Sequence, residues 1–217
     1  MSEPVKTPDR KARAARTRLR ILAAAYELCL EQGYADASMG RIAARAGVAV
    51  QTVHFVFHTK EELLAAVIDA AVIGLLPVGG EPEAPEESTW WHEAKTEADA
   101  RRAIALFVDG CLLVLARSAE ISVQAMLAAK ASESLAELVA ESEEHRIREY
   151  RTFAQSLSDR GMLRADVDVQ RATDVLGALV GDECYLAFVV TRGWGAETYA
   201  EWLKAELPRM LLPSHVP

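Results

Sequence analysis

The twenty residues 38–57 constrain the fold more than any other part of this 217-residue chain. They read SMGRIAARAGVAVQTVHFVF. One short helix fits residues 38–46, with Ser38 as its N-cap, and a second fits residues 50–57. Gly47 lies between them, and glycine readily adopts the positive φ that a tight turn needs. The spacing predicts a helix-turn-helix at 38–57, with an ordinary helical hairpin as the alternative.

Most of the remaining chain also has a helical pattern, because apolar residues recur every three or four positions and β-branched runs are short. The segment PVGGEPEAPEES, residues 77–88, holds three prolines and two glycines and is predicted to be a loop. We therefore expect an all-α protein with a flexible basic arm (1–14), a helix-turn-helix domain (15–75) and a second helical domain (76–217). Further helices are expected at 17–32, 60–71, 97–117, 119–130, 133–160, 169–191 and 197–211.

Charge is distributed unevenly along the chain. Residues 1–60 contain 10 Lys and Arg against 5 Asp and Glu, whereas residues 61–217 contain 14 against 27, within a net charge of −8. A polyanion would be attracted to the first segment and repelled by the second. The alternative is a basic, disordered tail, since seven of the ten Lys and Arg residues in 1–60 lie before residue 21.

The cysteines and the N-terminus indicate a compartment. Three widely separated cysteines, Cys29, Cys111 and Cys184, suit a reducing environment better than a disulfide framework or a zinc site. The polar, basic start lacks the apolar segment of a secretory signal, and no run is long enough to span a membrane. We expect a cytoplasmic protein.

No motif indicates catalysis, a cofactor or a metal ion. Nucleotide-binding, hydrolase and metalloprotease signatures are absent from the sequence. His145 has Glu141 and Glu149 at four-residue spacing, which suits a metal, but so charged a segment more often forms a solvated helix face. We predict no enzyme activity and no metal site.

Residues 17–67 resemble the DNA-binding domain of the TetR family of bacterial regulators. The matching positions are Ile21-Leu22, Ala24-Ala25, Gly33-Tyr34, Ser38, Ile42-Ala43, Ala46-Gly47-Val48, Thr52-Val53, Phe57, Lys60 and Leu63-Leu64. The segments RGMLRADVDVQRATD and RGWGAETYAEWL near the C-terminus resemble the family more loosely.

The resemblance implies a homodimeric transcription regulator with an N-terminal helix-turn-helix domain of three helices. Its C-terminal helical domain would bind a small-molecule effector and form the dimer. The expected function is a repressor that a largely hydrophobic effector releases from palindromic double-stranded operator DNA. A helical enzyme or carrier with a basic arm, and an activator of the same family, are the alternatives.

The DNA-contacting positions implied by the resemblance are Ser38, Arg41, Val50, Gln51, Thr52, His54, Phe55, His58 and Lys60. Ser38, Thr52 and Lys60 would bind phosphates, while Gln51 would read a base edge, adenine best. His54 stands where relatives commonly have tyrosine, which weakens a phosphate contact. Ala49 replaces the usual polar cap of the recognition helix.

Two further sets of residues are expected in the second domain. Gly177 and Gly181 lie four residues apart, so they fit either a dimer interface or close packing inside one chain. The other candidate dimer residues are Val180, Tyr199, Trp202 and Leu203. The candidate effector pocket consists of Trp90, Phe107, Cys111, Met126, Phe153, Leu157, Tyr185 and Phe188, each of which also suits an ordinary core.

Overall fold

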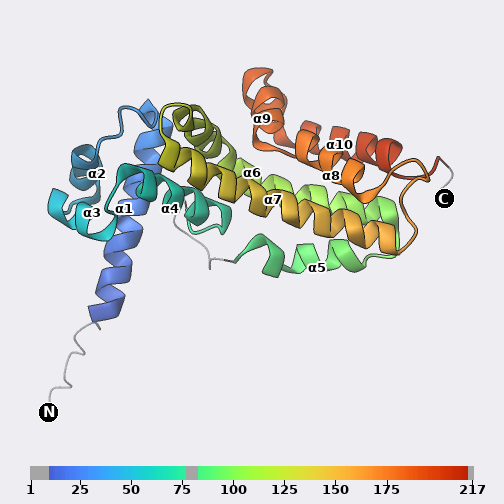
Figure 1. The fold of residues 1–217 in the computed structure, drawn as a ribbon, viewed down its shortest axis with the longest axis horizontal. Coiled ribbons are helices and arrows are strands. Elements are labelled where there is room, and N and C mark those ends of the chain that lie inside the picture. Colours follow the sequence, from blue (N-terminus) through green and yellow to red (C-terminus); the bar gives the residue numbers. More distant parts are fainter. Residues whose placement is uncertain (1–9, 77–82, 215–217) are drawn as a thin grey trace, which may run out of the picture. The chain divides into compact units, whose positions relative to one another are not determined.

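The computed structural model describes residues 10–76 and 83–214, and every regular element in these residues is helical, which confirms the all-α prediction. The helices are α1 (Arg10–Gln32), α2 (Met39–Ala46), α3 (Val50–Val56), α4 (Lys60–Val72), η1 (Pro85–Glu87), α5 (Thr89–Thr96), α6 (Ala100–Ala129), α7 (Glu133–Asp159), α8 (Val169–Leu179), α9 (Asp182–Tyr185), η2 (Leu186–Thr191) and α10 (Ala196–Leu211) (Figure 1). None of the described helices is long and apolar enough to cross a membrane.

The chain divides into two compact units, Met1–Val67 and Ile68–Pro217. The first unit holds α1, α2, α3 and the beginning of α4. Its fully buried side chains come from all four helices: Ile21, Ile42, Val53, Leu63 and Val67 are at most 1% exposed. Helix α4 begins in the first unit and ends in the second.

Helix α1 starts earlier than the sequence pattern predicts. Residues 10–14 of the expected flexible arm are helical, because Arg, Lys and Ala are strong helix formers. Residues 1–9 lie outside the described residues.

In the second unit, the long helices α6 and α7 lie side by side (Figure 1). Helices α8 and α10 flank them on one side and α5 on the other. The core between these helices includes Phe107, Phe153, Leu157 and Leu176, all 0% exposed.

Helix α6 is one continuous helix, although the sequence pattern suggested a break near residue 118. Ser118 donates its hydroxyl to the carbonyl of Val114 at 3.0 Å, within the same helix. The hydroxyl is therefore satisfied by the preceding turn and does not cap a new helix.

The helix expected at 169–191 is interrupted instead. Helix α8 ends at Leu179, and Gly181 is extended with φ −100° and ψ 164°. The Tyr150 hydroxyl of α7 donates to the carbonyl of Val180 at 2.8 Å. This buried bond satisfies a carbonyl that the interrupted helix leaves without its usual partner.

Helix α5 was not predicted, because its sequence follows a loop rich in proline and glycine. Tertiary packing explains its position: Trp91 is 3% exposed, and Trp90 lies over Gly110 of α6. A Cβ atom at Gly110 would stand 2.0 Å from the Trp90 ring, so only glycine admits the indole there.

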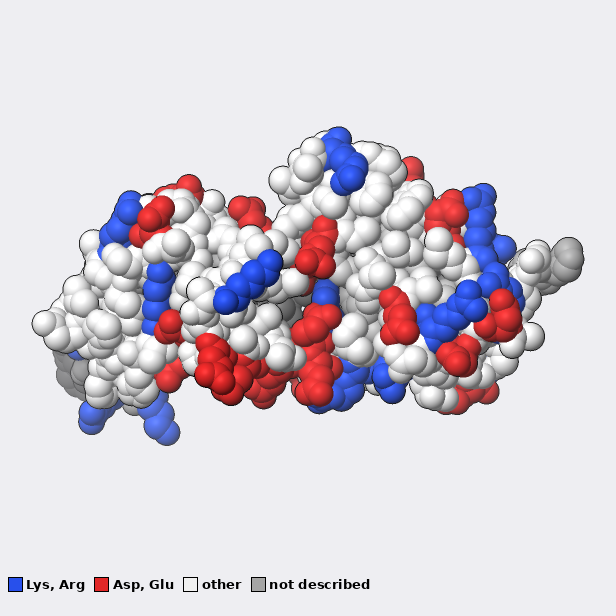
Figure 2. All heavy atoms as spheres, turned by 45° about the horizontal axis from the view of Figure 1, so that its top comes forward, with Lys and Arg blue, Asp and Glu red and all other residues white. Residues whose placement is uncertain are grey.

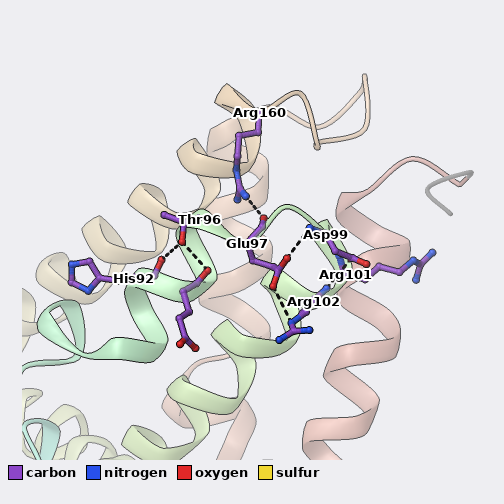
Figure 3. Close-up of polar contacts among 8 residues, drawn as sticks. His92, Thr96, Glu97, Asp99, Arg101, Arg102 and Arg160 are labelled. Atoms are coloured by element: carbon purple, nitrogen blue, oxygen red, sulfur yellow. Dashed lines mark hydrogen bonds and ion pairs between the residues drawn. The ribbon is translucent and has the colours of Figure 1, made fainter.

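A polar network orders the turn between α5 and α6 (Figure 3). Asp99 caps α6 by accepting from the backbone N–H groups of Arg101 at 2.8 Å and Arg102 at 3.1 Å. Glu97 pairs with Arg102 at 2.9 Å. Arg160, at the end of α7, donates to the backbone carbonyl of Glu97, which ties two ends of the core helices together.

Candidate nucleic-acid interface

The turn between α2 and α3 has the geometry that the spacing predicts. Gly47 has φ +63°, in the left-handed region that favours glycine. The backbone N–H of Gly47 donates to Ala44 at 3.2 Å, and that of Val48 to Ala43 at 3.0 Å. These bonds satisfy carbonyls at the end of α2 and aim the chain into α3.

Arg20 of α1 holds the same turn from outside. Its guanidinium donates to the carbonyls of Ala46 and Gly47, the latter at 3.2 Å. A Cβ atom at Gly47 would lie 2.8 Å from the guanidinium, so the glycine also makes room for this side chain. From the sequence, Arg20 counted only as one positive charge of a basic tail. The one hint of its role was that Arg20 directly precedes the apolar Ile21.

Two other contacts of α1 fix the motif. Arg45 of α2 pairs with Glu27 at 3.1 Å and Glu31 at 2.7 Å. The hydrogen bond from Arg45 holds the pKa of Glu31 below its ordinary value. The Arg18 guanidinium lies 4.3 Å from the ring centre of Phe57, directly after α3.

Helix α3 buries one side and exposes the other. Val53 is 0% exposed, whereas Phe55 is 83% and Val50 40% exposed. Gln51 and His54 are also exposed, and Thr52 is half-buried. Among the described residues Phe55 is the most exposed large apolar side chain, so its ring is accessible to a partner. Ala49 caps α3 without a side-chain hydrogen bond.

The remaining predicted positions occupy helix starts. Ser38 caps α2 by accepting from the backbone N–H of Arg41 at 3.3 Å, and the Arg41 side chain is exposed. His58 is exposed and donates its backbone N–H to Glu62 at 3.1 Å. Thr59 caps α4 by accepting from the Glu62 N–H at 3.0 Å.

Lys60 differs from the other predicted positions, because its side chain turns inward. The ammonium lies 4.1 Å from the Tyr34 ring centre and donates to the carbonyls of Tyr34 and Ala35. Burial lowers the pKa of Lys60 from its ordinary value. In this arrangement Lys60 stabilises the turn that follows α1. To bind a phosphate, the Lys60 ammonium would have to leave these carbonyls and move outward.

The start of α1 adds positive charge. Arg10, Lys11, Arg13 and Arg16 are exposed, and the helix has no acidic residue in its first turn. Figure 2 shows Lys and Arg side chains projecting near this end of the chain, whereas patches of both signs are interspersed over the rest of the face drawn.

The predicted effector-pocket residues mostly form a filled core. Phe107 and Phe153 stack with ring centres 4.2 Å apart, and both are 0% exposed. Cys111 is buried beside them, which raises the pKa of its thiol to about 12. Leu157 and Tyr185 belong to the same cluster.

The other three pocket candidates lie around that core or away from it. Trp90 and Phe188 are half-buried and pack against the cluster, whereas Met126 lies outside it. Seven of the eight candidates therefore lie in or against one core, and the effector pocket stays a prediction.

A partly buried ion pair in the same unit was not anticipated from sequence. Asp182 Oδ2 lies 3.2 Å from Arg146 NH1, at the point where α9 begins. Burial raises the pKa of Asp182 to about 6, against the opposing effect of Arg146. The two residues lie 36 positions apart in the chain, so no local pattern reveals the pair.

The glycines proposed for a dimer interface pack inside the protomer. A Cβ atom at Gly177 would stand 2.9 Å from the Ile147 side chain of α7, and one at Gly181 would stand 2.6 Å from the Gly177 carbonyl. These contacts favour the internal-packing alternative for both glycines.

The other dimer candidates are also largely internal. Val180, Tyr199 and Leu203 are 0% exposed in one chain, and Trp202 is half-buried. The dimer interface therefore stays a prediction; exposed apolar side chains near these positions are Val190 at 64% in η2 and Met210 at 39% in α10.

Comparison with known proteins agrees with this geometry. Residues 21–67 match the family model described as bacterial regulatory proteins, tetR family. No curated protein sequence matches the chain.

Solved structures match over nearly the whole length. One, described as a TetR-family transcriptional regulator from Mesorhizobium loti, is 19% identical with TM-score 0.69, covering 93% of this chain and 99% of that one. A transcriptional regulator from Saccharomonospora viridis in complex with choline is 18% identical with TM-score 0.69, covering 92% and 99%. NalD, the secondary repressor of the MexAB-OprM multidrug efflux pump in Pseudomonas aeruginosa, is 22% identical with TM-score 0.66, covering 94% and 100%.

Residues 21–67 thus form a domain of the TetR family of bacterial regulatory proteins, and the chain has the fold of TetR-family transcriptional regulators.

Proposed function

We propose that this chain is a homodimeric transcription regulator that binds a palindromic DNA operator through α3 and releases it on binding a small molecule. The observation that carries the proposal is the outer face of α3, where Gln51, His54 and Phe55 are exposed on a helix that Val53 anchors. This helix lies inside the segment that matches the family model.

The side chains of α3 suit the major groove of DNA. An α-helix fits that groove, and a glutamine amide can pair with both the donor and the acceptor of adenine. The exposed ring of Phe55 suits the methyl group of thymine. Base contacts of this kind give sequence preference, and each good pair discriminates by roughly 1–3 kcal/mol.

Phosphate contacts would come from the surrounding elements. Ser38 and Thr52 carry hydroxyls at the starts of α2 and α3, and Arg41 is exposed beside the first of these. The basic start of α1 supplies further charge. Such contacts position the protein on the duplex and make its affinity fall with salt.

The regulatory part of the proposal concerns the second unit. NalD is named as a repressor, and the S. viridis protein is bound to choline. For this chain, we favour repression relieved by a largely hydrophobic effector, because the core of the second unit is aromatic and aliphatic. Because many of these side chains are buried against one another, an effector that bound among them would displace some of them, and it acts only by binding one state better than the other.

The test is selection of bound sequences from a random pool of double-stranded DNA by the full chain. We expect an enriched palindrome whose half-sites are separated by about one helical turn or a multiple of it. Failure to enrich any sequence, with equal retention of all DNA, would contradict the proposal. Turnover of a small molecule without DNA binding would favour the enzyme alternative.

A further inference from the structure

Helix α1 extends beyond the part of the first unit that it packs against. Its first buried side chain is Ile21, at 0% exposure. Residues 10–16, the basic extension, are all exposed and form almost two helical turns, about 10 Å at 1.5 Å per residue. In Figure 1 this end of α1 (blue) projects past α2 and α3, which belong to the same unit.

One side of α1 continues from its packed part into the basic extension. This side is formed by positions three or four residues apart: 10, 13, 17, 21, 24 and 28. From position 21 onward the side is buried, since Ile21 and Leu28 are at most 4% exposed. Before position 21 it presents Thr17, Arg13 and Arg10, of which both arginines are exposed. The side that packs into the domain core is therefore continued by basic residues at the surface.

The charges of the basic extension are unfavourable in the chain alone. Arg10, Arg13 and Arg16 follow one another at three-residue spacing, and like charges at this spacing repel. The first turn holds no acidic residue, so positive charge also opposes the helix dipole. Within residues 10–76 and 83–214, no salt bridge joins these three arginines to another residue. A polyanion along this surface would replace the repulsion with attraction.

Two contacts fix the direction in which the basic extension projects. Arg20 donates to the carbonyls of Ala46 and Gly47 in the α2–α3 turn. Arg18 stacks on the ring of Phe57, directly after α3. Both arginines lie within four residues of the extension, which is therefore held in a set direction relative to α3. A duplex contacted by α3 continues beyond the half-site, and its flanking phosphates carry the complementary charge.

We infer that the basic extension is a second DNA-binding surface, which contacts phosphates flanking the half-site and adds affinity without adding sequence preference. Charge complementarity and continuity with the candidate interface of α3 identify the partner as DNA. The inference rests on the proposed function, since it lengthens the DNA contact of the same domain. The extension is about as long as three base pairs, at roughly 3.4 Å each.

The experiment measures how much flanking DNA strengthens binding. Each full chain is titrated with the selected palindrome cut at the outer ends of its half-sites. It is also titrated with the same palindrome lengthened at each end by about six base pairs, roughly twice the expected contact. The ratio of the two affinities is the flank gain. The extension variant carries Arg10→Gln, Arg13→Gln and Arg16→Gln.

A matched control variant removes the same charge elsewhere. It carries Arg101→Gln, Lys130→Gln and Arg148→Gln, three exposed basic residues of the second unit. All six substitutions are at exposed positions, so both variants should keep the helix content and Tm of the unsubstituted chain. Circular dichroism checks this before the titrations.

We expect a flank gain of about tenfold or more in the unsubstituted chain and in the control variant, and almost none in the extension variant. Each phosphate neutralised contributes roughly −0.9 to the slope of log affinity against log salt. The extension variant should therefore have a shallower salt slope on the long duplex but not on the short one. An unchanged flank gain in the extension variant, or an equal loss in the control variant, would overturn the inference.

Two further comparisons test the helix and the phosphates separately. Ala12→Gly with Ala15→Gly keeps every basic residue but weakens the helix that aligns them, so the flank gain should fall at least about threefold. An unchanged gain would show that a flexible basic segment is enough. Flanks rich in A·T and flanks rich in G·C should give equal gains. A gain confined to A·T-rich flanks would mean minor-groove reading and would contradict the phosphate contacts.

The results separate the inference from the proposed function. If the full chain enriched a palindrome but the flank gain did not depend on the three arginines, the inference would fail and the proposed function would stand. If no sequence were enriched, but the extension variant bound an unrelated duplex about tenfold more weakly than the control variant, the proposed function would fail. The basic extension would then still be a DNA-binding surface.

Discussion

Gly47→Ala should destabilise the chain more than alanine at either of the other two glycines of the first unit, Gly33 and Gly40. The residue has φ +63°, and a Cβ atom would meet Arg20 at 2.8 Å. The left-handed conformation costs an alanine roughly 1–2 kcal/mol. Displacing Arg20 from its carbonyl partners adds about 1 kcal/mol. The expected loss of unfolding free energy is therefore about 2–3 kcal/mol.

Two neighbouring glycines separate these contributions. Gly33 has φ +84° but nothing within 4 Å of a Cβ atom, so Gly33→Ala should show the conformational cost alone, roughly 1–2 kcal/mol. Gly40 lies in α2 with open space and an ordinary φ. Gly40→Ala should therefore stabilise the chain by roughly 0.5–1 kcal/mol.

Urea unfolding of the full chain, followed by circular dichroism, measures the three differences. Thermal unfolding gives a second measure. If the first unit unfolds independently, each kcal/mol of lost unfolding free energy should lower its Tm by roughly 4–8 °C. In an Arg20→Met background, Gly47→Ala should cost no more than Gly33→Ala does. Equal costs for Gly47→Ala and Gly33→Ala in the unsubstituted chain would refute the role given to Arg20, and a neutral Gly47→Ala would refute the turn.

Three other predictions follow from the structure. Gln51→Ala should relax the base preference at one position of the operator, whereas Lys60→Ala should weaken binding to all DNA sequences about equally and lower the stability of the chain. Measuring the affinity of each variant for single-base variants of the operator distinguishes the two effects. Identical affinity profiles would contradict the roles assigned to Gln51 and Lys60. Because burial raises the pKa of Asp182 from 3.8 to about 6, the stability that its protonated form contributes is lost as the pH rises through this window. The unfolding free energy should fall by about 2 kcal/mol relative to Asp182→Asn between pH 4 and pH 6, and parallel pH profiles would be the opposing result. Gly181→Ala should destabilise more than Gly177→Ala, since the first meets a backbone carbonyl and the second a flexible side-chain end; thermal denaturation showing the reverse order would contradict the packing described.

Local chemistry explains which parts of the fold could be predicted. Ser38 and Thr59 act as N-caps and Gly47 takes positive φ, because each depends on a few neighbouring residues. The break after Leu179 and the helix that places Trp90 over Gly110 depend on distant partners. Sequence periodicity does not report such contacts, since tertiary packing overrides local propensity.

In the candidate site, too, local features could be predicted from the sequence and contacts with distant residues could not. The exposed face of α3 follows from helical periodicity once Val53 is placed inward. Arg20 and Lys60 carry charges that a sequence assigns to the surface, yet both donate to backbone carbonyls of neighbouring turns. Long basic side chains can reach several elements, so their partners are fixed only when the chain has folded.

Sequence-specific binding to DNA through α3 is tested most directly by titrating the selected palindrome with the full chain over a range of salt concentrations. Phe55→Ala serves as the variant and an unrelated duplex of equal length as the control. We expect log affinity to fall linearly with log salt, with a slope of roughly −0.9 for each phosphate neutralised. Phe55→Ala should lower affinity for the palindrome while leaving affinity for the unrelated duplex and the salt slope unchanged. A flat salt dependence, or equal affinity of the unsubstituted chain for the two duplexes, would contradict the account.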